Sequence, residues 1–418
     1  MVYQVTSATY GNSQSDNYAY DPMGNRTSAS IASQGAGSTT YTANNANQYT
    51  SITGLTPISH DANGNLLQQN NVTYVWDSEN RLLSVTPNIP TLGDSSLVHT
   101  YDGQHRRVTR SIREWTAGGW AITETLHFVY DGWNVIEEYA LNASSSTLIR
   151  NLTWGQDLGG SATLQAAGGV GGLLMVEEIT GSTTTAYHFH YDGNGNVTEI
   201  TDLSGNSAAS YRYDAFGNTL VFTGPYAAEN RYRFSTKPLD HEVTDAPLYY
   251  YGYRYYDPLT GRWPSRDPIE EKGGLNLYCF VDNNGINRID ILGQKSALDC
   301  LGKIKDILDG NYQSTDVGKN QDKQNHCVAS CELSNECGEI VAALLGGIKE
   351  QPDIMMDVVG SIIGTVSPAI QNLIREITKH NSVKDSIDDM IADAEGLSCA
   401  DSRTQTCDCC CLGRGVSN

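Results

Sequence analysis

The sequence lacks any long apolar run and is poor in basic residues. A membrane-spanning helix needs about 20 mostly apolar residues in succession, so no span is expected. Lys and Arg number 27 against 48 Asp and Glu, giving a formal net charge of -21. Since sequence-independent binding of nucleic acid requires a basic surface, this charge argues against it. The first residues, Met1 to Gln4, show no basic region followed by an apolar block, so no secretory signal is visible.

Cysteine is nearly absent from the first part of the chain. Of ten cysteines only Cys279 precedes Gly293, and the other nine follow it. Apolar residues at helical spacing appear beyond the same point, in stretches such as 326–349 and 354–380. We therefore predict a small, mainly helical, cysteine-rich domain over residues 294–418.

Tyrosine is abundant in this chain, whereas Phe and Met are scarce. The chain has 24 Tyr and 41 Gly but only 6 Phe and 6 Met, and 39% of its residues are hydrophobic. A tyrosine ring can be buried while its hydroxyl group stays hydrated or hydrogen-bonded. Tyrosine, more than leucine, is thus expected to pack this protein.

An aromatic residue followed by aspartate recurs along the chain, usually with Gly and then Asn or Arg a few residues later. Aromatic and polar residues alternate before the aspartate, which places the aromatic rings on one face of a strand, and Asp and Gly favour a turn. The pairs Asn63–Gly64 and Asn194–Gly195 predict tight two-residue hairpin turns. Such a hairpin buries its aromatic face only against its neighbours, so the sequence predicts a mainly β protein with a long curled or spiral sheet. The recurring pairs are Tyr20–Asp21, His60–Asp61, Trp76–Asp77, Tyr101–Asp102, Tyr130–Asp131, Tyr191–Asp192, Tyr213–Asp214 and Tyr256–Asp257.

A glycine cluster at 168–172 does not match a phosphate-binding loop, because no Lys-Ser or Lys-Thr follows it. Tight turning of the backbone, or close packing against the wall of the sheet, is the expected role of these glycines.

The stretch 249–285 is the most distinctive part of the chain. It contains YYYGYRYYDP, then LTGRWPSRDP, and runs on to Asn276–Tyr278 and Asp282–Gly285. It resembles the core-associated segment that ends the repeat region of Rhs/YD-repeat proteins. The resemblance implies three parts: a shell of repeats over 1–248, the core motif over 249–293 and a variable C-terminal domain over 294–418.

The same resemblance implies a role and partners. Members of this family form large β-shells that carry a variable, usually toxic, C-terminal domain. We therefore expect the C-terminal part of a secreted or surface-delivered protein, with further repeats upstream in a longer chain. A small immunity protein encoded nearby is the partner that the family implies.

Self-cleavage is a further property of the family, and it uses aspartates near a terminal Asp-Pro-x-Gly motif. The matching positions are Asp267, which follows Arg266, and Asp290. Two neighbouring carboxyl groups can divide the roles of base and acid, and the adjacent Arg266 guanidinium can hold one of them ionised. The cut is expected just after Gly293 or Gln294.

The chain departs from the family pattern at two positions in this motif. Ile291 stands where proline is usual, and Gln294 stands where a large apolar residue follows the glycine. The alternative is that Asp267 and Asp290 only cap turns.

The C-terminal part offers two further candidate sites. His326 and Ser330 are four residues apart and would share a helix face, either with Ser330 as nucleophile and His326 as base or as a packed polar pair. His326, Cys327 and Cys331 could bind zinc, although the spacing is not a paired Cys-x-x-Cys pattern. Disulfides are the favoured use of the cysteines, and no cofactor is predicted. The disulfide candidates are Cys327, Cys331, Cys337, Cys399, Cys407, Cys409, Cys410 and Cys411.

Three classes of function stay open at this point. The leading one is a toxin-delivery shell around a C-terminal effector. The others are a surface adhesion or carbohydrate-binding module with a non-enzymatic cap, and a passive carrier of a C-terminal hydrolase. The first predicts harm to a cell that expresses residues from about 295 onward, the second predicts none, and the third predicts harm that is lost when His326 is replaced.

Overall fold

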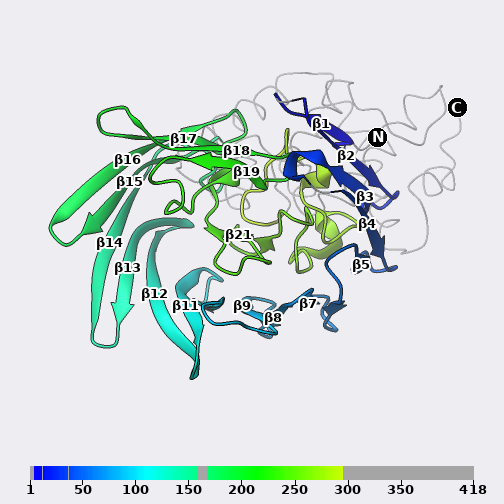
Figure 1. Cartoon of the computed structure of the whole chain (residues 1–418), viewed down its shortest axis with the longest axis horizontal. Helices are drawn as coiled ribbons and strands as arrows, with labels where there is room; N and C mark the ends of the chain where they lie inside the picture. Colours follow the sequence, from blue (N-terminus) through cyan, green and yellow to red (C-terminus); the bar gives the residue numbers. More distant parts are fainter. Residues whose placement is uncertain (1–3, 12, 36, 159–166, 295–418) are drawn as a thin grey trace, which may run out of the picture.

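The computed structural model describes residues 4–11, 13–35, 37–158 and 167–294, which fold mainly as antiparallel β-sheet (Figure 1). Within each of three sheets, consecutive strands are neighbours. The predicted mainly β architecture is confirmed, whereas the predicted helical domain lies beyond Gln294 and so outside the described residues.

The strands divide into sheets of five, fourteen and three members. The first sheet contains β1 (Ser7–Thr9), β2 (Ser15–Tyr20), β3 (Arg26–Ile31), β4 (Ser38–Ala43) and β5 (Tyr49–Ile52). The second contains β6 (Ile58–His60), β7 (Leu66–Gln69), β8 (Val72–Trp76), β9 (Leu82–Pro87), β10 (Ser95–Tyr101), β11 (Arg107–Thr116), β12 (Gly119–Asp131), β13 (Asn134–Asn142), β14 (Ser145–Trp154), β15 (Leu173–Thr180), β16 (Thr183–Tyr191), β17 (Val197–Asp202), β18 (Ser207–Tyr213) and β19 (Thr219–Thr223). The third contains β20 (Leu239–Asp240), β21 (Leu248–Tyr250) and β22 (Tyr255–Tyr256), and short 3-10 turns lie at η1 (Ala32–Gln34), η2 (Phe234–Thr236), η3 (Glu270–Gly273) and η4 (Val281–Asn283).

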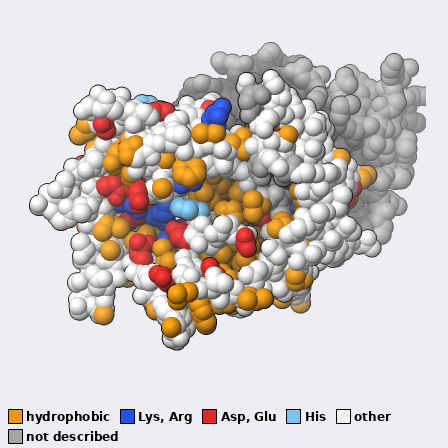
Figure 2. All heavy atoms as spheres, in the orientation of Figure 1, with side chains coloured by type: hydrophobic (Ala, Val, Ile, Leu, Met, Phe, Trp, Pro, Cys, Tyr) orange, Lys and Arg blue, Asp and Glu red, His pale blue; other side chains and the backbone are white. Residues whose placement is uncertain are grey.

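The two larger sheets curl around the segment that follows β19. In Figure 1 this inner segment, which carries the small sheet, lies in the middle of the curve formed by β6 to β19 on one side and β1 to β5 on the other. Figure 2 shows a hollowed face where acidic and basic side chains gather beside apolar ones. The curled sheet that the repeats predict is thus present, and it is filled by the chain's own later residues.

The turns between repeats are built around the aspartate. At Asp61 the backbone N–H donates to the carbonyl of Asn65 (2.9 Å), and the Gly64 N–H donates to the carbonyl of Asp61 (3.0 Å). The pairing register shifts between Ser59 and His60, and Gly64 has a φ of +86°. The prediction of a two-residue turn was therefore wrong: three residues form the loop, with glycine in the bulge. The reason is the Asp61 side chain, which accepts both the N–H (2.8 Å) and the side-chain amide (2.9 Å) of Asn65 and so stabilises a five-residue unit.

The aromatic residue before most of these turns connects one repeat to the preceding one. Its polar tip donates a hydrogen bond to a backbone carbonyl at or near the start of a strand in the preceding repeat, as Tyr101 does to Leu82 (2.6 Å) and Tyr213 to Val197 (2.8 Å). The ring is buried while the hydroxyl group is satisfied, which is why tyrosine or tryptophan suits this position. The other donor and acceptor pairs are Tyr20 to Val5, Trp76 to Leu66, Tyr130 to Arg107, Trp154 to Val135 and Tyr191 to Leu173.

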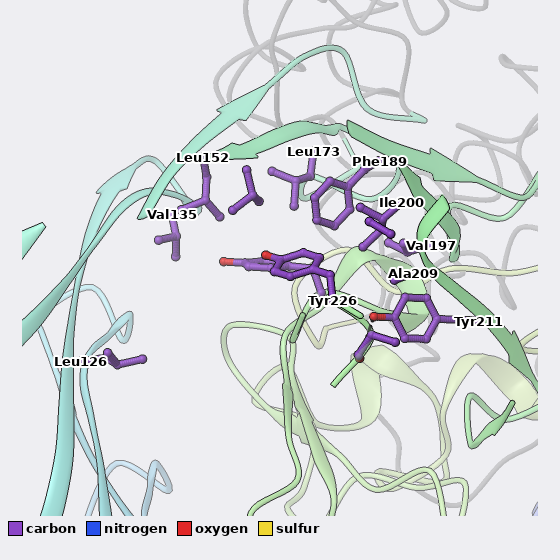
Figure 3. Close-up of a cluster of buried hydrophobic side chains, with 14 of the residues drawn as sticks. Leu126, Val135, Leu152, Leu173, Phe189, Val197, Ile200, Ala209, Tyr211 and Tyr226 are labelled. Carbon is purple, nitrogen blue, oxygen red and sulfur yellow. Dashed lines mark hydrogen bonds between the residues drawn. The ribbon is translucent and has the colours of Figure 1, made fainter. Parts of the chain in front are cut away.

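The inner segment packs on the concave face of the large sheet. Apolar side chains from consecutive strands, including Leu152, Leu173 and Phe189, point toward Tyr226 (Figure 3). A buried ionic contact adds to this packing, since the Asp240 carboxylate lies between Arg107 and Arg110 of β11. Apolar and charged contacts together hold the inner segment in one position.

Candidate functional site

Asp267 and Asp290 meet at a single guanidinium group, that of Arg254. Arg254 lies in the short link between β21 and β22, and its Nη2 is 2.7 Å from Oδ2 of Asp267 and 3.8 Å from Oδ2 of Asp290. The exposed fractions of these three residues are only 3%, 7% and 5%. The predicted pair of aspartates is thus brought together in a buried site around the Arg254 guanidinium.

The Arg254 side chain is held on every side. Its guanidinium carbon lies 4.1 Å from the centre of the Trp263 ring. Nη1 donates to the carbonyl of Leu277 (3.2 Å), and Nε donates to the carbonyl of Gly293. A planar guanidinium stacked on an aromatic ring and bonded through several N–H groups has one orientation, which lysine could not reproduce.

Arg266, the basic residue predicted to act on the aspartates, lies elsewhere. Its side chain is exposed and approaches the turn at Gly64. The guanidinium that contacts both carboxylates belongs to Arg254, 13 residues before Asp267. Sequence reasoning missed Arg254 because it lies 13 residues before Asp267, whereas Arg266 is adjacent to that aspartate in the chain.

Asp290 is a carboxyl group with an unusual environment. Its Oδ1 accepts hydrogen bonds from the backbone N–H of Gly293 (2.6 Å) and of Gln294 (3.0 Å). Burial raises the pKa of Asp290 from 3.8 to about 7, and the Asp267 carboxylate adds to the rise, whereas Arg254 and the two N–H groups oppose it. Near neutral pH a substantial fraction of Asp290 therefore carries a proton.

Asp267 has a different set of partners. Its Oδ2 accepts a charge-assisted hydrogen bond from Arg254 (2.7 Å), and its Oδ1 accepts the backbone N–H of Ile269 (3.0 Å). The bond from the guanidinium is charge-assisted and therefore stronger than a bond between neutral groups. Two carboxyl groups in unlike surroundings can take unlike roles in proton transfer.

The segment that follows Asp290 is held at three successive carbonyl groups. The carbonyl of Ile291 accepts from Nζ of Lys237 (2.7 Å), and that of Leu292 accepts from the N–H of Tyr253 (2.9 Å). The third, that of Gly293, accepts from Arg254 as described above. The Gly293–Gln294 peptide group therefore has its carbonyl oxygen on Arg254 and its N–H on Asp290.

The other predicted site residues fall outside the described part of the chain. These are His326, Ser330 and the eight cysteines from Cys327 to Cys411, so the zinc and disulfide hypotheses remain predictions. Within the described residues, no three or more His, Cys, Asp and Glu side chains come together as a possible metal site. Cys279 has a free thiol there, and burial raises its pKa to about 12. None of the helices in these residues is both long and apolar enough to span a membrane.

Comparison with known proteins matches residues 191–221 to the RHS Repeat family. The tRNA3(Ser)-specific nuclease WapA of Bacillus spizizenii is 28% identical over 295 residues, which are 69% of this chain but 11% of that protein. YlbH of Escherichia coli K12, a putative uncharacterized protein, is 35% identical over 177 residues, 38% of this chain and 72% of YlbH. The Photorhabdus luminescens Tc holotoxin pore has a similar fold, with a TM-score of 0.54 and 22% identity over 68% of this chain and 13% of that one.

Proposed function

The chain belongs to the RHS-repeat family, and from this premise we propose that it is the C-terminal part of a toxin-delivery protein whose β-shell cuts itself beside Asp290. The proposal has two parts, since the sheets act as a container and the buried aspartates act as a protease. The chain spans only 11% of the WapA relative, so the activity of the whole protein is itself part of the proposal.

The observation that carries the proposal is the arrangement of Asp267, Arg254 and Asp290 around the Gly293–Gln294 peptide group. Hydrolysis of an amide needs a base for water, stabilisation of the oxyanion and an acid for the leaving nitrogen. Asp267 supplies the base and the Arg254 guanidinium stabilises the negative charge that develops on the carbonyl oxygen. Asp290, whose pKa is raised to about 7, supplies the acid.

Asp267 removes a proton from water as the water oxygen bonds to the carbonyl carbon. The proton of the Asp290 carboxyl group passes to the amide nitrogen, and the C–N bond breaks. The products are a new carboxyl terminus on the shell and a new amino terminus on the C-terminal domain. After proton exchange with solvent, both aspartates return to their starting states.

The cut follows Gly293 or Gln294. The first bond is favoured by contacts within the described residues, because Arg254 bonds its carbonyl oxygen and Asp290 bonds its N–H. The length of the N-terminal fragment distinguishes the two, since it ends in one more glutamine in the second case.

Intact-mass analysis of the purified full-length chain tests the proposal. We expect two fragments from the wild type and one uncut mass from Asp290→Asn. Asp282→Asn is the matched control, because Asp282 lies in the same segment but pairs with Arg288 near the surface. An uncut wild type, or the same split in Asp290→Asn, would remove the protease from the proposal.

The C-terminal domain is proposed to be the effector, and a small immunity protein its partner in the producing cell. Delivery outside that cell follows from this role. Growth of bacteria that express residues 295–418 under a tight promoter tests it, with His326→Ala as the comparison. Growth arrest supports an effector, and loss of arrest in His326→Ala supports an enzymatic one.

Among the described residues, no contact favours the adhesion hypothesis over this one. That hypothesis requires aromatic faces open to a ligand. In the described repeats, Tyr74 and Tyr211 are each only 2% exposed, and the hydroxyl group of Tyr213 donates to the backbone of the preceding repeat.

A further inference from the structure

Lys237 is a buried amine that the repeats and the aspartate pair leave unexplained. It follows η2, is 6% exposed, and Nζ donates to the carbonyl groups of Ile291 (2.7 Å) and Gly168 (2.8 Å). Burial lowers its pKa to about 8, while Asp290 and Asp157 oppose the change. A buried ammonium group is costly, so its position between two carbonyl groups and two carboxylates needs an account.

The loop that holds the Gly168 carbonyl is itself fixed against the cleavage segment. The Asp157 carboxylate accepts the N–H groups of Ala167 (2.6 Å) and Gly169 (3.1 Å), which fixes the backbone on either side of Gly168. A Cβ atom on Gly168 would lie 2.2 Å from the carbonyl oxygen of Ile291, so only glycine permits the approach. The close packing predicted for the glycine cluster is present here, and its neighbour is the segment after Asp290.

We propose that Lys237 is a positioning residue for self-cleavage, one that ties the Gly168 loop to the Ile291 carbonyl and so fixes Asp290 against the peptide bond it protonates. This inference rests on the proposed self-cleavage. Ile291 adjoins Asp290, and its carbonyl is the first of the three held in succession. Without that bond the turn from Asp290 to Gly293 keeps its two other carbonyl contacts but loses the one nearest the acid.

The charge of Lys237 gives the role a signature that simple packing lacks. The ionisable groups that interact with Asp290 are Arg254, Asp267, Lys237 and Tyr251. Lys237 in turn interacts with Asp157, and its Nζ lies 5.3 Å from the centre of the Tyr251 ring. Removing the ammonium leaves Asp290 with one fewer cation, which favours its protonated form. The fall in cleavage rate on the alkaline side then moves to higher pH.

The test follows cleavage in time. Full-length chains are made by pulse-labelled cell-free synthesis and chased at pH 6 to 9, and appearance of the N-terminal fragment gives a first-order rate. We expect Lys237→Met to cleave about 10- to 100-fold more slowly, because a misplaced reacting group costs this order of rate. The alkaline limb of its pH–rate profile shifts to higher pH. Lys237→Arg, which keeps the charge, recovers most of the rate and the original pH–rate profile. Arg212→Met, which removes an exposed cation on β18, keeps the wild-type rate.

The outcomes separate this inference from the proposed function. A wild type that cleaves and a Lys237→Met variant that matches it in rate and pH profile would overturn the positioning role alone. A slow Lys237→Met chain with an unshifted profile and no recovery in Lys237→Arg would make Lys237 a structural residue and overturn the role as well. A wild type that stays whole overturns both. Equal resistance of the shell to trypsin in all variants shows that they are folded.

Discussion

Asp290 should cost the shell stability at neutral pH, and replacing it with asparagine should recover that stability. The replacement is best made in an Asp267→Asn background, in which neither protein cleaves. An asparagine Oδ1 can accept the same N–H groups of Gly293 and Gln294 that the carboxylate accepts. The change thus removes the buried charge while it keeps the turn.

The size of the effect follows from the pKa of Asp290. A rise from 3.8 to about 7 corresponds to roughly 4 kcal/mol at about 1.36 kcal/mol per pH unit. Because the folded-state pKa lies above that of the unfolded chain, the stabilising contribution is complete below pH 3.8 and is lost as the pH rises through about 7. Relative to the asparagine variant, the parent should lose about 2 to 4 kcal/mol between pH 4 and pH 8, the lower value allowing for the missing Asp267 charge.

Urea unfolding at several pH values measures the difference. All six tryptophans precede Gly293, so their fluorescence reports on the shell and not on the C-terminal domain. The difference in unfolding free energy between the two proteins should be near zero at pH 4 and reach its full value by pH 8. Asp282→Asn in the same background is the control, and its difference should stay within about 0.5 kcal/mol, as for a surface substitution.

One result would refute the reasoning. If the difference between parent and Asp290→Asn is the same at pH 4 and pH 8, Asp290 is ionised throughout and cannot be the acid of the cleavage step. Burial would then not raise the pKa of Asp290 in the way the proposal requires.

Three other substitutions follow from the contacts. Arg254→Met should abolish cleavage and lower the free energy of unfolding by about 3 to 5 kcal/mol, because it leaves buried carboxylates without their cation. Arg266→Gln, at the surface, should cleave like the wild type. Intact mass measures cleavage and urea unfolding measures stability, and equal effects of the two substitutions would contradict the assignment of Arg254. Tyr213→Phe should cost about 1 kcal/mol through the lost hydrogen bond to the preceding repeat, and an unchanged unfolding midpoint would show that this contact contributes nothing. Gly168→Ala should lower both the cleavage rate and the stability. Gly181 has a similar φ (+61° against +60°) but lies in open space, so Gly181→Ala should lower only the stability, by about 1 kcal/mol of backbone strain. Similar losses of cleavage and stability in the two variants would contradict the close approach at Gly168.

Much of the fold could be predicted because it depends on residues that are close together in the sequence. The alternation of aromatic and polar residues before an aspartate specifies a strand with one buried face, and Asp with a following Gly or Asn specifies a turn. The length of that turn was predicted wrongly at Asn63–Gly64, since the two-residue signal ignored the bonds that Asp61 makes with Asn65. The choice of Asp267 and Asp290 came from family resemblance, and the structure places both beside one guanidinium group.

By itself, the sequence determined the repeat, the strand, the use of tyrosine in place of leucine and the two aspartates of the candidate site, because each depends on residues that are close together in the chain or on a recognised motif. Only the tertiary structure decided that Arg254 and not Arg266 contacts those aspartates, and that Lys237 and Gly168 close on Ile291. These partners come from an inner segment and a glycine loop that meet only when the sheet curls around the chain that follows it. Burial in that curled sheet also sets the pKa of Asp290, a property that no local pattern of residues encodes.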